Sequence, residues 1–244
     1  MQQLDKVNAG LLAGLSRQVP GLLAGTGGGT GGGGGAIAFL DVDDTVREVH
    51  GHAKQSAAFG YTGQRGLNVQ LATISSPTAA PVIARARLRK GNTASATGAG
   101  RLLAQAISTA RAAGVHAQIL ARADSAYYGH AFVGTALRHR AWFSVTARMT
   151  PAVTRAITTI APGAFSAISY PHAVFDDAEQ RRVSDAEVAE VDVGAFTGRR
   201  KAEQVTCRFV VRRVKDSSPS PATAPPRASC SRPTANTPSS PTAP

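Results

Sequence analysis

The sequence predicts an α/β fold built around a mixed five-stranded sheet. The first observation behind this prediction is an apolar run that ends in acids, residues 36–45, and that has a counterpart at residues 117–125. The second is the order of the predicted elements, in which three strands precede an alternation of helices and strands. Each acid-terminated run is typical of a buried strand that carries a carboxylate to its C-terminal end, where sheets place functional groups.

Three strands in succession form the first half of the predicted sheet. Strand one spans residues 36–43 and places Asp43 at its exit. Residues 66–74 and 81–89 alternate apolar and polar side chains, and the second of these runs carries its arginines on one face. Alternation with a period of two indicates half-buried strands, and we expect the three to pair in antiparallel fashion.

Helices and strands alternate in the second half. The predicted bounds are 98–113 (helix), 117–123 (strand), 128–139 (helix), 141–147 (strand) and 151–160 (helix). Gly114 suits the position after a helix end, and Pro151 suits a first helical position. The full order is therefore β-β-β-α-β-α-β-α, which is the order of the ribonuclease H-like fold. A right-handed crossover after strand three would lay strand four beside strand one, so that Asp43 and Asp124 converge.

The flanking segments differ in composition from this core. We expect five regions: a helical remnant at 1–24, a glycine-rich linker at 25–35, the core at 36–160, a β-rich insertion at 161–215 and a disordered Pro/Ser-rich tail at 216–244. The glycine run lacks the Gly-Lys-Ser/Thr ending of a phosphate-binding loop, which favours a linker. The tail has almost no core-forming residues, which favours disorder.

Charge and cysteine content restrict the partner and the compartment. The chain has 27 Lys and Arg against 15 Asp and Glu, a net charge of +12 and a pI near 10.8. A protein with so large a positive charge is expected to bind a polyanion, most simply nucleic acid. Cys207 and Cys230 lack metal-ligand spacing and suit a reducing cytosol. No apolar run is long enough for a membrane span, so a cytoplasmic, nucleoid-associated protein is expected.

The acids suit divalent metal chemistry. In a strand, Asp41 and Asp43 point to one side and Asp44 to the other. A turn-forming role for this cluster, and a helix-capping role for Asp124 before Ser125, are the structural alternatives. Paired carboxylates at the ends of neighbouring strands favour a metal-binding site over these structural roles. A complete site of this kind holds two Mg²⁺ or Mn²⁺ ions about 4 Å apart and catalyses phosphoryl transfer.

Basic residues are expected to hold double-stranded DNA by its phosphates, which positions the duplex without reading its sequence. They flank predicted strands three and five. The residues concerned are Arg85, Arg87, Arg89, Lys90, Arg138, Arg140 and Arg148.

Four stretches carry a family resemblance: residues 39–46, 59–61, 66–68 and 122–128. Together they resemble the DDE transposases of bacterial insertion sequences, over roughly residues 36–215. The resemblance implies a transposase that cuts and joins DNA with Mg²⁺ or Mn²⁺. Its substrates would be transposon ends and target DNA, and a homodimer is one assembly that we consider. By analogy, Asp43 matches the first catalytic aspartate and Asp124 the second, with Asp41 as an auxiliary metal ligand.

The third acid of that family has no clear match in this chain. In the family it is a glutamate on a helix after a β-rich insertion, but the predicted helix at 151–160 has no acid. Glu187, Glu190 and Glu203 fall within the predicted insertion and are poor substitutes. We therefore expect a truncated, frameshifted copy that is catalytically inactive or nearly so.

Two other functions remain open at this point. Asp41-Val42-Asp43-Asp44-Thr45 also fits the DxDxT motif of haloacid dehalogenase-like phosphatases, with Asp41 as nucleophile, Asp43 as general acid and Mg²⁺ as cofactor. That fold expects a helix after the first strand, leaves Asp124 without a role and does not suit so basic a chain. The other alternative is a non-catalytic DNA-binding remnant of the same fold.

Overall fold

The computed structural model divides the chain into two compact units, Met1–Arg148 and Met149–Pro244. The predicted glycine linker and most of the predicted tail lie outside the residues that the structure describes. Those residues are 2–19, 21–23, 37–51, 53–76, 79–170, 175–176, 181–182, 186–214 and 227–231.

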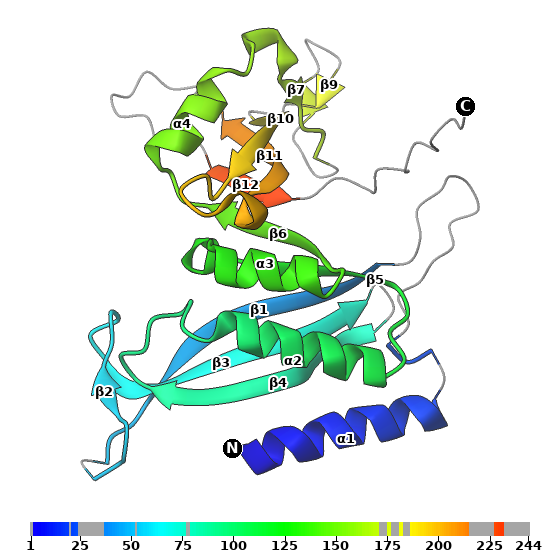
Figure 1. Cartoon of the computed structure of the whole chain (residues 1–244), viewed down its shortest axis with the longest axis vertical. Helices are drawn as coiled ribbons and strands as arrows, with labels where there is room; N and C mark the ends of the chain where they lie inside the picture. Colours follow the sequence, from blue (N-terminus) through cyan, green and yellow to red (C-terminus); the bar gives the residue numbers. More distant parts are fainter. Residues whose placement is uncertain are drawn as a thin grey trace. The chain divides into compact units, whose positions relative to one another are not determined.

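The first unit contains a mixed sheet with strand order β4-β3-β1-β5-β6 (Figure 1). Antiparallel pairing joins β1 to β3 and β3 to β4, whereas β5 runs parallel to both β1 and β6. A two-residue strand, β2 (Ala58–Phe59), adds to one end of β3. This topology confirms the predicted ribonuclease H-like α/β fold. The strand bounds are β1 Ile37–Glu48, β3 Arg65–Ser76, β4 Ala79–Lys90, β5 Gln118–Ala123 and β6 Trp142–Ala147.

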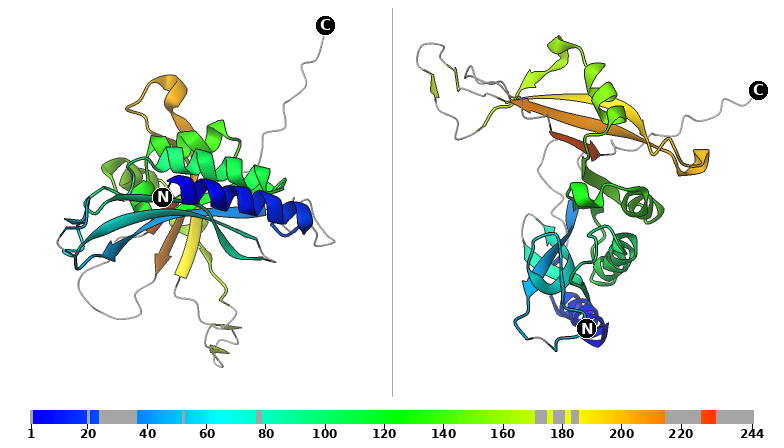
Figure 2. Two further views of the ribbon diagram at one scale, coloured as in Figure 1. Left: turned by 90° about the horizontal axis from the view of Figure 1, so that it is seen from below. Right: turned by 90° about the vertical axis from the view of Figure 1, so that its left-hand side faces the viewer.

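Three helices lie on one face of this sheet, as the two views of Figure 2 show. They are α1 (Gln2–Gln18), α2 (Ala99–Ala112) and α3 (His130–Arg138). Apolar residues of α2 recur at helical spacing and are buried, among them Leu102 and Ile107. On β1, the alternate residues 38, 40 and 42 are buried as well. Strand alternation therefore directs Asp41 and Asp43 away from the helices, and Asp44 toward them.

Strand β1 continues beyond the predicted end. The prediction ended the strand at residue 43, but β1 runs to Glu48 because it pairs with β3 as far as Glu48 and Gly66. Its parallel pairing with β5 ends earlier, at Val42 and Ala123. Asp43 thus lies directly beyond the last residue pair of β1 with β5, but within the part of β1 that pairs with β3.

The second unit is rich in β structure. Its longest strands pair antiparallel with each other, and its first helix begins at Pro151, where the side chain of Thr150 accepts a hydrogen bond from the Val153 amide. That helix, α4, groups with this unit, although it was predicted to close the core. The elements are α4 Pro151–Thr158, η2 Pro162–Ala164, β7 Ser166–Ala167, β8 Phe175–Asp176, β9 Arg181–Arg182, β10 Ala186–Ala195, η3 Lys201–Glu203, β11 Val205–Val214 and β12 Arg227–Ser231.

Strand β12 departs from the predicted disorder of the tail. Its five residues pair antiparallel with β11, from Arg227 opposite Arg212 to Ser231 opposite Arg208. Composition alone did not indicate this pairing, because the segment contains little besides Ala, Ser, Arg and Cys. In the described part of the chain, no helix is long and apolar enough to span a membrane.

Candidate active site

A pocket of about 580 Å³ lies in the first unit, where β1 and β5 cease to pair. Its walls come from β1, β3, the turn after β2, the loop after β4, the start of the segment after β5 and the residue after β6. The lining residues are Asp43, Asp44, Val46, Gly60, Tyr61, Asn68, Gly91, Asn92, Thr93, Ala94, Ser95, Ala96, Asp124, Ala126 and Arg148.

Asp43 and Asp124 enter this pocket from equivalent positions. The last parallel pair of β1 and β5 is Val42 with Ala123, and each aspartate is the next residue of its strand or of the turn that follows. Neighbouring strands lie about 4.8 Å apart, so two such residues project side by side. Both residues are exposed to solvent. The structure therefore brings together the two acids that the sequence predicted to converge.

Each of these carboxylates accepts one backbone hydrogen bond through Oδ1. The amide of Asp44 donates to Asp43 over 2.8 Å, and the amide of Ala126 donates to Asp124 over 2.9 Å. The second bond caps the single-turn helix η1 (Ser125–Tyr127), so the capping role considered for Asp124 is confirmed. Among the described residues, Oδ2 of both carboxylates accepts no hydrogen bond. These oxygens remain available to a cation.

Asp44 lies on the other side of the strand in a buried polar network. Its side chain is 9% exposed and accepts a 2.9 Å charged hydrogen bond from Arg89, whose side chain is 7% exposed. The hydroxyl of Tyr127 donates to Asp44 over 3.0 Å, and the amide of Asn68 donates to it as well. Both oxygens of the Asp44 carboxylate accept hydrogen bonds from other side chains of the protein. Asp44 therefore lines the pocket, but its negative charge is paired with Arg89.

Arg89 extends the network to the loop after β4. Its Nη1 donates to the carbonyls of Ala94, Ser95 and Thr97, at 3.2, 3.2 and 2.7 Å. Desolvation by burial lowers the pKa of Arg89, although the nearby charge of Asp44 opposes this effect. The loop that forms one wall of the pocket is thus fastened to β1.

Asp41 is engaged elsewhere. Both of its oxygens accept hydrogen bonds from Arg122, at 2.6 and 2.8 Å, and this hydrogen bonding raises the pKa of Arg122. The guanidinium of Arg122 also stacks 4.3 Å from the ring centroid of Phe39. Asp41 does not line the pocket. The structure therefore does not bring this predicted auxiliary ligand together with Asp43 and Asp124.

The glutamates of the predicted insertion pair with arginines of the second unit. Glu187 contacts Arg213, Glu190 contacts Arg208, and Glu203 contacts Arg199. Within the described residues, no group of three or more His, Cys, Asp and Glu side chains has a geometry that holds a metal ion.

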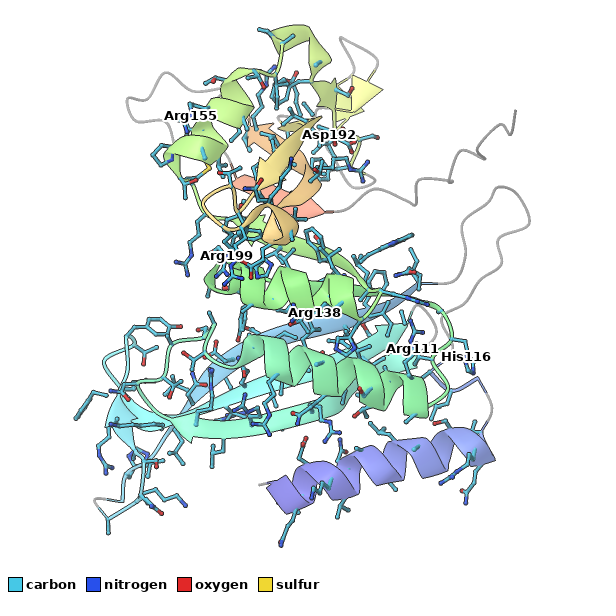
Figure 3. All side chains as sticks on the ribbon, in the orientation of Figure 1. Arg111, His116, Arg138, Arg155, Asp192 and Arg199 are labelled. Atoms are coloured by element: carbon cyan, nitrogen blue, oxygen red, sulfur yellow. The ribbon has the colours of Figure 1, made fainter. Side chains whose placement is uncertain are left out.

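The predicted DNA-contacting residues lie in different environments. Arg85 and Arg89 form intramolecular ion pairs. Arg85 pairs with Asp5 over 2.8 Å and donates a hydrogen bond to the Thr109 hydroxyl, and Arg89 pairs with Asp44. Arg148 lines the pocket and holds the turn of Asp124 by donating to the carbonyls of Ser125 and Ala126, at 2.9 and 3.3 Å. Arg148 is exposed, as are Lys90, Arg140 and Arg138, the last at the end of α3 (Figure 3).

Arg87 lines a second, basic pocket of about 370 Å³ between α1, β4 and α2. Lys6 and Arg101 line it too, and Arg87 donates a 3.1 Å hydrogen bond to the Gly98 carbonyl. Sequence reasoning did not identify this pocket, because its charges come from three separate elements.

Three functional side chains were not singled out from the sequence. Asn68 and Tyr127 bind Asp44, and Arg122 neutralises Asp41. Asn68 and Gln70 are polar residues on the buried face of β3, at 2% and 0% exposure, and a polar residue at buried strand positions was the available signal.

Residues 36–220 match a family model described as transposase DDE domain group 1. No curated protein matches the chain.

Breaking the buried ion pair should destabilise the first unit strongly. We expect Arg89→Ala to lower the free energy of unfolding by about 3 kcal/mol or more, because it leaves the Asp44 carboxylate buried and uncompensated. Arg122→Ala is the matched control, since that pair is 44% and 37% exposed and such pairs contribute about 0–1 kcal/mol. Urea denaturation of both variants measures the difference, and equal losses would contradict the assignment.

Tyr127 should stay protonated as long as the chain is folded. Burial raises its pKa well above the ordinary value of 10.0. Because the folded-state pKa is the higher one, the associated stability is complete below about pH 10 and is lost as the pH rises further. Absorbance at 295 nm should rise equally in the unaltered chain and in Tyr127→Phe until the alkaline unfolding transition. A tyrosinate signal missing from Tyr127→Phe before unfolding would refute this.

Proposed function

The chain belongs to the group 1 family of transposase DDE domains, and from this premise we propose that Asp43 and Asp124 form its DNA-cleaving site. The observation that carries the proposal is their convergence in one pocket directly after the last residue pair of two parallel strands. The substrate would be double-stranded DNA, at the ends of a bacterial insertion sequence and at its target.

The donor set fits a hard divalent cation. DDE transposase domains generally use such ions, and carboxylate oxygens are the ligands that Mg²⁺ and Mn²⁺ prefer. Asp43 and Asp124 would hold such an ion, since one carboxylate oxygen of each accepts no hydrogen bond from the described residues. A bound ion of this kind lowers the pKa of an attacking water and stabilises charge on the phosphate. We leave Asp41 out of the ligand set because Arg122 already occupies both of its oxygens.

The protein's own contribution is to fix the positions of these two carboxylates. Arg148 fastens the turn that carries Asp124, and the backbone amides of Asp44 and Ala126 fix one oxygen of each acid. Holding the groups in advance spares the reorganisation that the reaction would otherwise require. The Asp44–Arg89 pair keeps the opposite wall in place.

DNA would be held by exposed cations of the first unit, of which Arg148 lines the pocket and Lys90 directly precedes Gly91 of its wall. We propose Lys90, Arg138, Arg140 and Arg148 as phosphate contacts, and Arg87 as a further contact through the basic pocket that it lines. Arg85 and Arg89 are withdrawn from the set because each forms a largely buried ion pair, Arg85 with Asp5 and Arg89 with Asp44. The net charge of +12 supports binding of this sequence-independent kind.

We propose that strand cleavage by this chain is slow. Among the described residues, Asp43 and Asp124 are the acids that reach the pocket without an ion pair, whereas a two-ion site requires a third carboxylate. The phosphatase alternative loses support, because its nucleophile would be Asp41, and Asp41 is neutralised by Arg122 outside the pocket.

Plasmid nicking tests the assignment of the two acids. With Mn²⁺, we expect slow conversion of supercoiled plasmid to open circles, reduced at least tenfold in Asp43→Asn and in Asp124→Asn because each variant removes a metal-binding charge. Asp41→Asn should stay within about twofold of the unaltered chain. Activity that survives both changes, or that is lost in Asp41→Asn alone, would contradict the proposal.

The salt dependence of duplex binding tests the proposed phosphate contacts. Lys90→Gln and Arg138→Gln should each weaken binding and reduce the slope of log K against log salt by about 1, as expected for one lost phosphate contact. Arg17→Gln is the charge-matched control, since Arg17 is an exposed residue in the last turn of α1. Equal slopes for all three variants would show that the contacts lie elsewhere.

A further inference from the structure

Two aromatic side chains are exposed beside the acidic pocket. Tyr61 is 93% exposed and lies in the turn that joins β2 to β3, and Phe59, the last residue of β2, is 68% exposed. Single exposed apolar residues are ordinary on protein surfaces. Two rings within three residues form a more specific arrangement, because Tyr61 and the intervening Gly60 line the same pocket as Asp43 and Asp124.

The backbone of this turn is held closely against the rest of the sheet. A Cβ atom at Gly60 would lie 2.8 Å from the carbonyl oxygen of Gly91, and a Cβ at Gly91 would lie 2.0 Å from that of Gly66. The amide of Gly91 also donates to the carbonyl of Ser56 over 3.1 Å. Only glycine permits so close an approach of three backbone segments. The backbone that carries Tyr61 is therefore fixed with respect to the pocket while its ring remains in solvent.

The surroundings of the rings are polar and basic. Thr62 and Gln64 of the same turn are exposed, and so is Lys90, which directly precedes Gly91. A protein partner that bound through apolar contact would require a larger continuous apolar patch. An exposed aromatic ring on a closely held backbone, beside positive charge, is the combination found in single-strand binding sites, where bases stack on rings and the nucleic-acid backbone follows the positive charge.

We propose that Tyr61 is a stacking platform for an unpaired nucleobase of a DNA strand whose backbone enters the pocket of Asp43 and Asp124, with Phe59 extending the platform. The placement of that strand rests on the proposed function. Bases inside a duplex already stack on one another, so the platform acts on a frayed end or an overhang. It favours DNA whose terminal nucleotide is unpaired, and it does so without reading sequence, because every base has a π face.

Binding measured without metal separates this inference from cleavage. Fluorescence anisotropy would compare a blunt duplex with the same duplex bearing a four-nucleotide 3′ overhang, using the full chain and the variants Tyr61→Ala, Tyr61→Phe and Gln64→Ala. We expect the unaltered chain to prefer the overhang. Tyr61→Ala should lose about tenfold in overhang affinity and almost nothing on the blunt duplex. Tyr61→Phe and Gln64→Ala should keep the preference, and the salt slope should not change, because stacking releases no counterions.

Three results would overturn the inference. One is unchanged overhang affinity in Tyr61→Ala, and another is equal loss on both DNAs. The third is a change in the sedimentation of Tyr61→Ala with DNA affinity intact, which would assign the ring to a contact between copies of the chain. If the chain binds duplex DNA and nicks plasmid normally but does not prefer the overhang, the stacking role of Tyr61 is refuted and the proposed function is not. If nicking does not depend on Asp43 and Asp124, the proposed function is refuted.

Discussion

Parallel pairing of β1 with β5 determines where the chemistry of this chain lies. The pairing ends at Val42 and Ala123, and the residue after each of them is an aspartate. Beyond that point β1 continues on β3 alone, so the sheet opens and a pocket forms beside the two carboxylates. The helices on one face stabilise this arrangement by burying the alternate residues of β1. Loss of the pairing would separate the acids whatever the rest of the chain did.

Three aspartates within four residues of β1 have three different environments. Strand alternation directs Asp44 into the protein, where Arg89, Asn68 and Tyr127 satisfy it. Asp41 and Asp43 share the other face, but Asp41 lies opposite Arg122 on β5 and is neutralised by it. Asp43 lies past the end of β5, and no arginine of the described residues forms an ion pair with it. The same residue type thus supplies a structural anchor, a surface ion pair and a free carboxylate, according to its strand face and its cross-strand neighbour.

Much of the fold followed from the sequence because periodicity and element order are local properties. The strands around Asp43 and Asp124 were predicted within a few residues, and the crossover rule placed them side by side. The side-chain network of Asp44 was not predicted, because it depends on the register of β3 and β4, which brings Asn68 opposite Arg89. The extension of β1 to Glu48 and the exposure of Tyr61 have the same origin, since both depend on contacts made by distant segments.

Disulfide trapping tests the convergence of Asp43 and Asp124 most directly. In a chain whose own cysteines are replaced, Asp43→Cys with Asp124→Cys places two cysteines at adjacent strand positions whose backbones lie about 4.8 Å apart, within the Cα–Cα range that a disulfide spans. Asp41→Cys with Asp124→Cys offsets the pair by two residues, beyond about 7 Å, and should not bridge. The structure predicts a crosslink by mass spectrometry in the first pair and free thiols in the second. Free thiols in the first pair, or equal crosslinking in both, would contradict it.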